Sequence, residues 1–176
     1  MPRWTHKLSL DDCTKFLVLI GQRVLNKELI ENGNIPVYSA NVFEPFGYVN
    51  KLLIQDFSVD SVLWGIDGDW LVSFMPKDNP FYPTDHCGVL RCKTDQVNPR
   101  YLAHLLESEG KKMGFSRNYR ASIDRVKGIT FSVPDITEQN KVVAEVREIE
   151  VKIADAEKQL KALQGKTAEI LNKYLR

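Results

Sequence analysis

The most constraining feature of this sequence is the apolar pattern of its closing stretch, residues 137–176. Between Val142 and Tyr174, spacings of four and three residues alternate without a slip. A 3.5-residue period sustained over several heptads is typical of the seam of a left-handed coiled coil. Mixed charges occupy the positions between, as expected for a solvated face. We therefore predict one long helix with a continuous seam, in which the polar Thr167 occupies the position between Leu163 and Ile170. The apolar seam residues are Val142, Val146, Ile149, Ile153, Ala156, Leu160, Leu163, Ile170 and Tyr174.

The length of this helix limits what can cover its seam. At about 1.5 Å per residue it spans roughly 55–60 Å, whereas a globule built from the preceding residues has a diameter of roughly 35–40 Å. Two arrangements remain open. The helix packs across its own globule for half its length and frays, or it protrudes and a second chain covers the seam. We favour the second, so the seam is a predicted dimerisation surface. Gly165 on the outer face costs about 1 kcal/mol.

Composition narrows the class of protein. The chain has 176 residues, 43% of them hydrophobic, and a net charge of +1. That is enough for one core plus an appendage, and it argues against disorder and against a histone-like DNA binder. No apolar run approaches the ~20 residues that cross a bilayer. Cys13, Cys87 and Cys92 occur without a secretory signal, so we expect reduced thiols in a soluble, cytoplasmic protein.

The first 136 residues predict an α/β (α+β) domain. The stretch 9–21 has helical spacing behind Ser9, although "FLVLI" within it could equally form a buried strand. Strands are expected in "IPVY", on both sides of a hairpin turn at Asp67-Gly68, and in "HCGVLRC" and "ITFSV". The proline-rich stretch 75–85 reads as a loop. Asn98-Pro99 predicts the start of a helix that ends at Gly110. We place the domain boundary at residue 136.

Motifs that could carry catalysis have simpler interpretations. "NPFY" at 79–82 resembles the Asn/Asp-Pro-Pro-Tyr/Phe loop of adenine methyltransferases, but Phe81 replaces the second proline and no glycine-rich cofactor cradle is present. "DHCGVLRC" offers ligand types for zinc or a Cys/His dyad, yet we expect a core His86 that donates to Asp85 or to a backbone carbonyl. Asp67 and Asp69 are expected as turn residues. We predict no catalytic residue, metal or cofactor.

The segment 111–127 is the strongest candidate for binding. Its basic residues are opposed by Asp124 alone, and Phe115 and Tyr119 lie among them. Arginine beside planar and short polar side chains suits phosphate neutralisation and hydrogen bonding to base edges. The alternative is a solvated basic loop. The basic residues are Lys111, Lys112, Arg117, Arg120, Arg125 and Lys127.

Several stretches together resemble a known family. In chain order they are "GNIPVYSANV", "FGYV", "LWGIDGDW", "FYPTDHCGVLR", "GFSRNYRASIDRVKGI" and "VPDITEQNKVV". Their order and spacing are similar to those of the specificity subunits of type I restriction–modification systems. The resemblance implies a target recognition domain with a twisted mixed sheet and flanking helices, followed by a long conserved helix. It also implies a subunit without catalytic activity, whose methyltransferase subunits dock alongside and recruit the restriction subunit.

A complete subunit of that family holds two such units, whose long helices pack antiparallel as a ruler between two readers of a bipartite double-stranded DNA site. This chain has one unit, so the resemblance implies either a half-length subunit or an excised half. If the chain acts alone, we expect a homodimer through the long helix that reads an interrupted palindrome. A structural adaptor that tethers partner subunits without reading bases is the alternative. The expected DNA contacts are Lys77, Lys111, Lys112, Arg117, Asn118, Arg120, Ser122 and Arg125.

Overall fold

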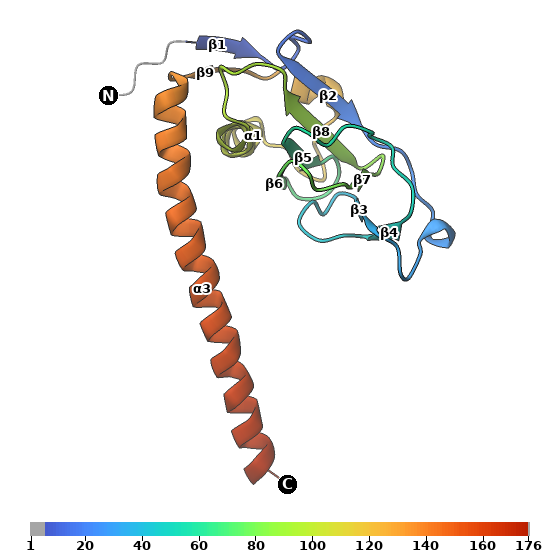
Figure 1. Ribbon diagram of the computed structural model, residues 1–176, viewed down its shortest axis with the longest axis vertical. Coiled ribbons are helices and arrows are strands. Elements are labelled where there is room, and N and C mark those ends of the chain that lie inside the picture. Colours follow the sequence, from blue (N-terminus) through green and yellow to red (C-terminus); the bar gives the residue numbers. More distant parts are fainter. Residues whose placement is uncertain (1–5, 176) are drawn as a thin grey trace. The chain divides into compact units, whose positions relative to one another are not determined.

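A computed structural model describes residues 6–175 as an α+β fold (Figure 1). The strands are β1 (His6–Ser9), β2 (Phe16–Ile20), β3 (Ile35–Tyr38), β4 (Gly47–Val49), β5 (Ser61–Gly65), β6 (Val72–Met75), β7 (Tyr82–Pro83), β8 (Cys87–Cys92) and β9 (Thr130–Val133). The helices are a short 3₁₀ turn (Asn26–Glu28), α1 (Pro99–Met113), α2 (Ile123–Lys127) and α3 (Ile136–Tyr174).

The strands are divided among three sheets. β2, β8, β5 and β6 form an antiparallel sheet in that order, β1 pairs with β9, and β4, β3 and β7 form a third sheet. The third sheet is mixed, because β3 runs antiparallel to β4 and parallel to β7. The expected α+β class and mixed sheet are confirmed, as is the hairpin about Asp67-Gly68, where Gly68 adopts φ +85. β7 is a short strand inside the stretch that was expected to be only a loop.

The prediction of a helix over residues 9–21 is wrong. The alternative, a strand at "FLVLI", is confirmed as β2. Asp12 forms a turn instead, in which its carboxylate accepts from the backbone N–H of Thr14 at 3.0 Å. β2 then pairs along its whole length with β8, from Phe16 opposite Cys92 to Ile20 opposite Gly88. The helical spacing is a local signal only. The segment forms a strand because it pairs with β8, some seventy residues further along the chain.

α1 begins as predicted but ends later. The side chain of Asn98 accepts from the backbone N–H groups of Arg100 and Tyr101, and Pro99 follows it. The expected end at Gly110 is wrong, because Gly110 is buried inside the helix, where an added Cβ would lie 2.2 Å from the ring of Trp70. The left-handed residue that ends the helix is Gly114, with φ 75. Gly110 is therefore a packing glycine rather than a stop signal.

The main core lies between α1 and the face of the β5–β6 hairpin. Trp64 on β5 and Leu102 on α1 are both fully buried there, with Leu106 and Phe16 at 1% exposure. Trp70 lies beside them and donates its indole N–H to the carbonyl of Glu107 at 2.9 Å. This packing fixes α1 and the strands that precede it, and so fixes the loops that join them.

The chain divides into two compact units, one ending at Gln139 and the other beginning at Asn140. α3 starts within the first, where the carboxylate of Asp135 accepts from the backbone N–H of Glu138 at 3.0 Å. The expected long helix is confirmed, with 39 residues in one uninterrupted element. Between residues 6 and 175, no helix is both long enough and apolar enough to cross a membrane.

Candidate nucleic-acid interface

The segment between α1 and α2, residues 114–122, forms a loop with buried ends and an exposed tip. We call it the arginine loop. Phe115 is 5% exposed, and its ring lies 5.0 Å from that of Trp70. Ser116 and Tyr119 exchange backbone hydrogen bonds of 3.0 and 3.1 Å, which makes a tight turn with Arg117 and Asn118 at its tip. The tip residues are exposed to solvent.

The other end of the arginine loop is tied to the core through Ala121, which is 2% exposed. The fully buried indole of Trp64 donates to the carbonyl of Ala121 at 2.9 Å, and the N–H of Ala121 donates to the carbonyl of Ile66 at 3.2 Å. Trp64 has room for this because its ring lies over Gly88, where a Cβ would approach it to 2.1 Å. The backbone beside Arg120 is therefore held against the backbone beside Asp67.

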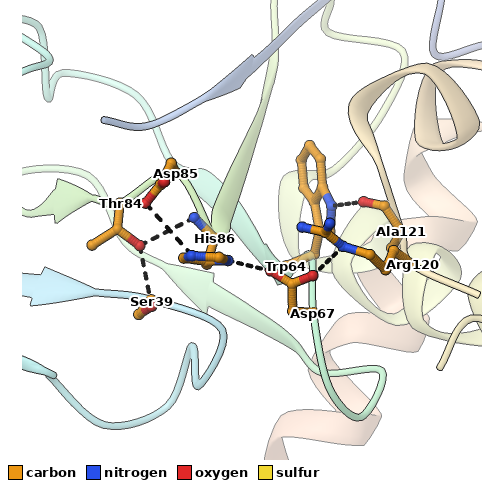
Figure 2. A network of polar contacts seen from close by, with 8 residues as sticks. All are labelled: Ser39, Trp64, Asp67, Thr84, Asp85, His86, Arg120 and Ala121. Carbon is orange, nitrogen blue, oxygen red and sulfur yellow. Dashed lines mark hydrogen bonds and ion pairs between the residues drawn. The ribbon is translucent and has the colours of Figure 1, made fainter. Parts of the chain in front are cut away.

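Asp67 connects the arginine loop to the segment before β8 (Figure 2). One carboxylate oxygen accepts from Nε of Arg120, and the other contacts Nδ1 of His86. On the far side of the ring, Nε2 of His86 lies 3.8 Å from Oδ1 of Asp85. The hydroxyl of Thr84 accepts from the backbone N–H of His86 at 3.2 Å. Three loops that are distant in sequence thus meet in one network of charged and polar side chains.

This arrangement corrects the expectation of a core histidine. The His86 side chain is 47% exposed, and its closest partner is Asp67 rather than Asp85 or a backbone carbonyl. Asp67 does lie in the expected turn, but it also carries the two contacts described above. No local pattern in the sequence predicts this pairing, because the two residues are 19 positions apart. Asp69 is an exposed turn residue.

The two cysteines at the ends of β8 are unsuited to nucleophilic chemistry. Burial raises the pKa of the Cys87 thiol to about 12, and burial likewise raises the pKa of Cys92 to about 12. A thiol with such a pKa carries almost no thiolate near neutral pH. Among residues 6–175, no three His, Cys, Asp or Glu side chains are grouped in a way that could hold a metal ion.

The two aromatic residues of the "NPFY" stretch are part of the core. Phe81 is 1% exposed and Tyr82 is 4% exposed, so neither ring can stack on an extruded base. Phe81 packs edge-on against Tyr38 and Phe57, with ring centroids 6.4 and 5.5 Å apart. The amide of Asn79 donates to the carbonyl of Lys77 at 3.0 Å, which closes a local turn.

Five of the predicted DNA-contacting residues lie on or beside the arginine loop. Arg117, Asn118 and Arg120 are exposed on the arginine loop. Arg125 on α2 supports that loop, because its guanidinium lies 4.0 Å from the centre of the Tyr119 ring and donates to the carbonyl of Arg120 at 2.7 Å. Ser122 is half-buried where α2 begins. These side chains gather on one feature of the fold.

The remaining predicted contacts are placed differently. Lys111 and Lys112 belong to α1 and form ion pairs with Glu107 and Glu109 at 2.5 and 2.6 Å. Asp124 is the one acidic residue within the segment, but Glu107 and Glu109 from outside it also oppose its lysines. The expectation that the whole segment is a loop is wrong, because its first residues belong to α1. Lys77 lies in the separate loop between β6 and β7. An open hollow of about 540 Å³ is lined by residues of the arginine loop and its surroundings, including Arg120, Ser122, Arg125 and Asp85.

The predicted dimerisation residues all lie on α3. Val142 is 36% exposed and Val146 is half-buried, while Ala156 is exposed. The large seam side chains beyond Val146 are more than half exposed: Ile149, Ile153, Leu160, Leu163, Ile170 and Tyr174. Val151 and Leu171, which are outside the seam, are also exposed.

The sequence belongs to the family described as the type I restriction modification DNA specificity domain, whose model matches residues 6–176. Among curated relatives, the chain is 27% identical over 125 residues to a Mycoplasma pneumoniae polypeptide named as the N-terminus of type I specificity subunit S.MpnORF289P. This match covers 70% of the chain and 65% of the relative. It is also 27% identical over 124 residues to the type I restriction enzyme MpnII specificity subunit from the same organism, covering 68% of the chain and 37% of the relative.

Solved structures share the fold. A type I restriction-modification S subunit from M. genitalium superposes with a TM-score of 0.67 at 16% identity, covering 90% of this chain and 42% of that one. The HsdS subunit from Thermoanaerobacter tengcongensis superposes with a TM-score of 0.59 at 16% identity, covering 90% and 40%. The chain thus spans less than half the length of these subunits.

Proposed function

We propose that this chain is a DNA sequence-recognition unit of a type I restriction–modification system. Residues 1–136 read one half of a bipartite double-stranded target, and residues 137–176 form the spacer and dimerisation arm. The chain itself performs no catalysis. Methyltransferase subunits dock on it and perform methyl transfer, and through them a restriction subunit joins the assembly. Family membership supports this proposal for the unit as a whole.

The observation that carries the proposal is that the arginine loop has two buried ends and an exposed, basic tip. Its ends are fixed by Phe115 and Ala121 in the core, while Arg117 and Asn118 are presented to solvent at its tip. Arginine and asparagine are the side chains that bind guanine and adenine edges through paired hydrogen bonds. A rigid support reduces the entropy lost when such side chains bind. A solvated basic loop would not need two buried anchors.

The exposed seam of α3 supports a homodimer. Large apolar side chains at seam positions are favourable only where another surface covers them. If two copies of the chain meet through this seam about a two-fold axis, the interface is isologous and the two recognition units are identical. Such a dimer reads an interrupted palindrome, and the helix length sets the separation of its halves.

The test is selection by the purified chain from a pool of duplexes carrying twenty-odd random base pairs, followed by titration of the enriched duplex at several salt concentrations. A sequence reader enriches a motif and binds it with an affinity that falls steeply with salt, because phosphate contacts release counterions. A structural adaptor enriches nothing and shows no salt-dependent affinity for any duplex. That second result would reject the proposal.

Single substitutions locate the contact surface. Arg117→Ala and Arg120→Ala are each expected to weaken binding to the enriched duplex by about 1–3 kcal/mol where the arginine contacts a base. Lys27→Ala, which removes a positive charge from the exposed 3₁₀ turn, serves as the matched control and should leave affinity nearly unchanged. Fluorescence anisotropy measures all three variants. Unchanged affinity in both arginine variants would remove the arginine loop from the interface.

A further inference from the structure

Arg120 differs from the other arginines near it because a carboxylate holds its side chain. Nε of Arg120 donates to Oδ1 of Asp67, whose second oxygen contacts Nδ1 of His86 (Figure 2). Arg117, at the tip of the same loop, forms no ion pair with any residue between 6 and 175. The two arginines are therefore presented differently, one free to rotate and one restrained.

The backbone brings Arg120 and Asp67 together independently of their charges. Ala121 follows Arg120 and donates its N–H to the carbonyl of Ile66, which precedes Asp67. The buried indole of Trp64 binds the same Ala121 from the other side at 2.9 Å. Core contacts thus fix the backbone on both sides of the ion pair. The fold therefore places Arg120 next to Asp67 whether or not their side chains attract each other.

The restraint leaves a defined pair of donors. Guanidinium is a planar group with five N–H donors, and Asp67 occupies the one on Nε. The Arg120 side chain is 56% exposed while that of Asp67 is 29% exposed, and the contact through Nε leaves the donors on Nη1 and Nη2 unused by that carboxylate. Two parallel donors match the O6 and N7 acceptors of guanine. They do not match adenine, which presents one acceptor and one donor in the major groove.

We infer that Asp67 is a positioning residue that aims Nη1 and Nη2 of Arg120 at the guanine of a G·C pair in the target half-site. This inference rests on the proposed function. An unrestrained arginine can turn to a phosphate as readily as to a base, and a phosphate contact carries no sequence information. Asp67 removes that freedom, and His86 supports the carboxylate from its other side. The half-site therefore contains a guanine whose recognition needs both Arg120 and Asp67.

The experiment uses the full chain and the duplex that it enriches from a random pool. Asp67→Asn keeps the shape of the side chain but removes its charge, and Asp69→Asn removes the same charge from an exposed residue two positions away. If carboxylates here act only by repelling DNA, both variants bind as tightly as the unmodified chain or more tightly. The inference predicts that Asp67→Asn alone loses roughly tenfold or more in preference for guanine at one position.

The base contact is checked on the DNA side with 7-deazaguanine, which lacks the N7 acceptor. Replacing each guanine in turn should weaken binding by the unmodified chain at one position and have no further effect there on Arg120→Ala, which has no donor to place against the base. Retained guanine preference in Arg120→Ala, or identical base preferences in Asp67→Asn and Asp69→Asn, overturns the inference. Enrichment of no motif by the unmodified chain rejects the proposed function instead.

A measurement without the Asp67 substitution covers the case in which that variant fails to fold. The Nε–H resonance of Arg120, assigned by its disappearance in Arg120→Lys, should exchange with solvent about tenfold or more slowly than that of Arg117, because a carboxylate accepts from it. Equal exchange rates for the two arginines would show that Asp67 does not restrain Arg120 and would overturn the inference.

Discussion

At the scale of single residues, the most informative side chain is Gln139, which is fully buried at the start of α3. Its carbonyl oxygen accepts from the backbone N–H of Asn98 at 2.9 Å. Its amide donates to the carbonyls of Gln96 and Pro134 at 2.9 and 2.8 Å. One side chain thus joins the start of α1, the end of β9 and the first turn of α3.

Replacing Gln139 by leucine should destabilise the fold by about 2–4 kcal/mol, because it deletes three hydrogen bonds and leaves the carbonyls of Gln96 and Pro134 without their amide donor. Gln55→Leu at an exposed position is the control and should change the free energy of unfolding by less than about 0.5 kcal/mol. Urea denaturation followed by circular dichroism measures both. Equal midpoints for the two variants would contradict this role of Gln139.

The candidate site shows where single-residue reasoning from the sequence stops. Arg117, Asn118 and Arg120 stand out by composition, and the structure places all three on one exposed loop. Asp67 and His86 were considered but were expected as a turn residue and a core residue, because an aspartate before glycine is ordinary turn chemistry. Their partnership depends on a backbone pairing between Ile66 and Ala121, which are far apart in the chain. Such a pairing has no local signature.

At the scale of elements, local signals predicted β3, β5, β6, β8 and β9, because each carries a β-rich run bounded by turn residues. The helix N-cap at Asn98 was likewise predicted from the local sequence, because a proline follows it. β1 was missed and β2 was left open between a helix and a strand, since each is completed by a strand distant in sequence, β9 and β8 respectively. The end of α1 was misplaced because Gly110, which resembles a stop signal, is needed for close packing against Trp70.

Two helical glycines should therefore respond oppositely to alanine. Gly165→Ala in α3 meets nothing within 4 Å and should stabilise the helix by about 0.5–1 kcal/mol. Gly110→Ala in α1 would place a methyl group 2.2 Å from the ring of Trp70 and should destabilise the fold by about 1–3 kcal/mol. Thermal unfolding of the matched pair is the measurement. Stabilisation by both substitutions would show that Trp70 can move aside freely.

At the scale of the whole molecule, the exposed seam of α3 predicts association. A dimer has a mass of twice 20.2 kDa, or about 40 kDa, and sedimentation equilibrium at micromolar concentration should find that species. Ile153→Asp places a charge in the seam and should shift the chain to monomer. Asn172→Asp introduces the same charge outside the seam and should leave the dimer intact. A 20 kDa species in the unmodified chain at every concentration would contradict the predicted dimer.

The central claim, that this chain selects a DNA sequence for a partner enzyme, is tested most directly by methylome sequencing. Cells carrying the chain together with its cognate methyltransferase subunit are compared with cells carrying the methyltransferase alone. The account predicts a modified, interrupted motif that appears only when the chain is present and that disappears in Arg117→Ala, Arg120→Ala cells. An identical methylome with and without the chain would contradict it.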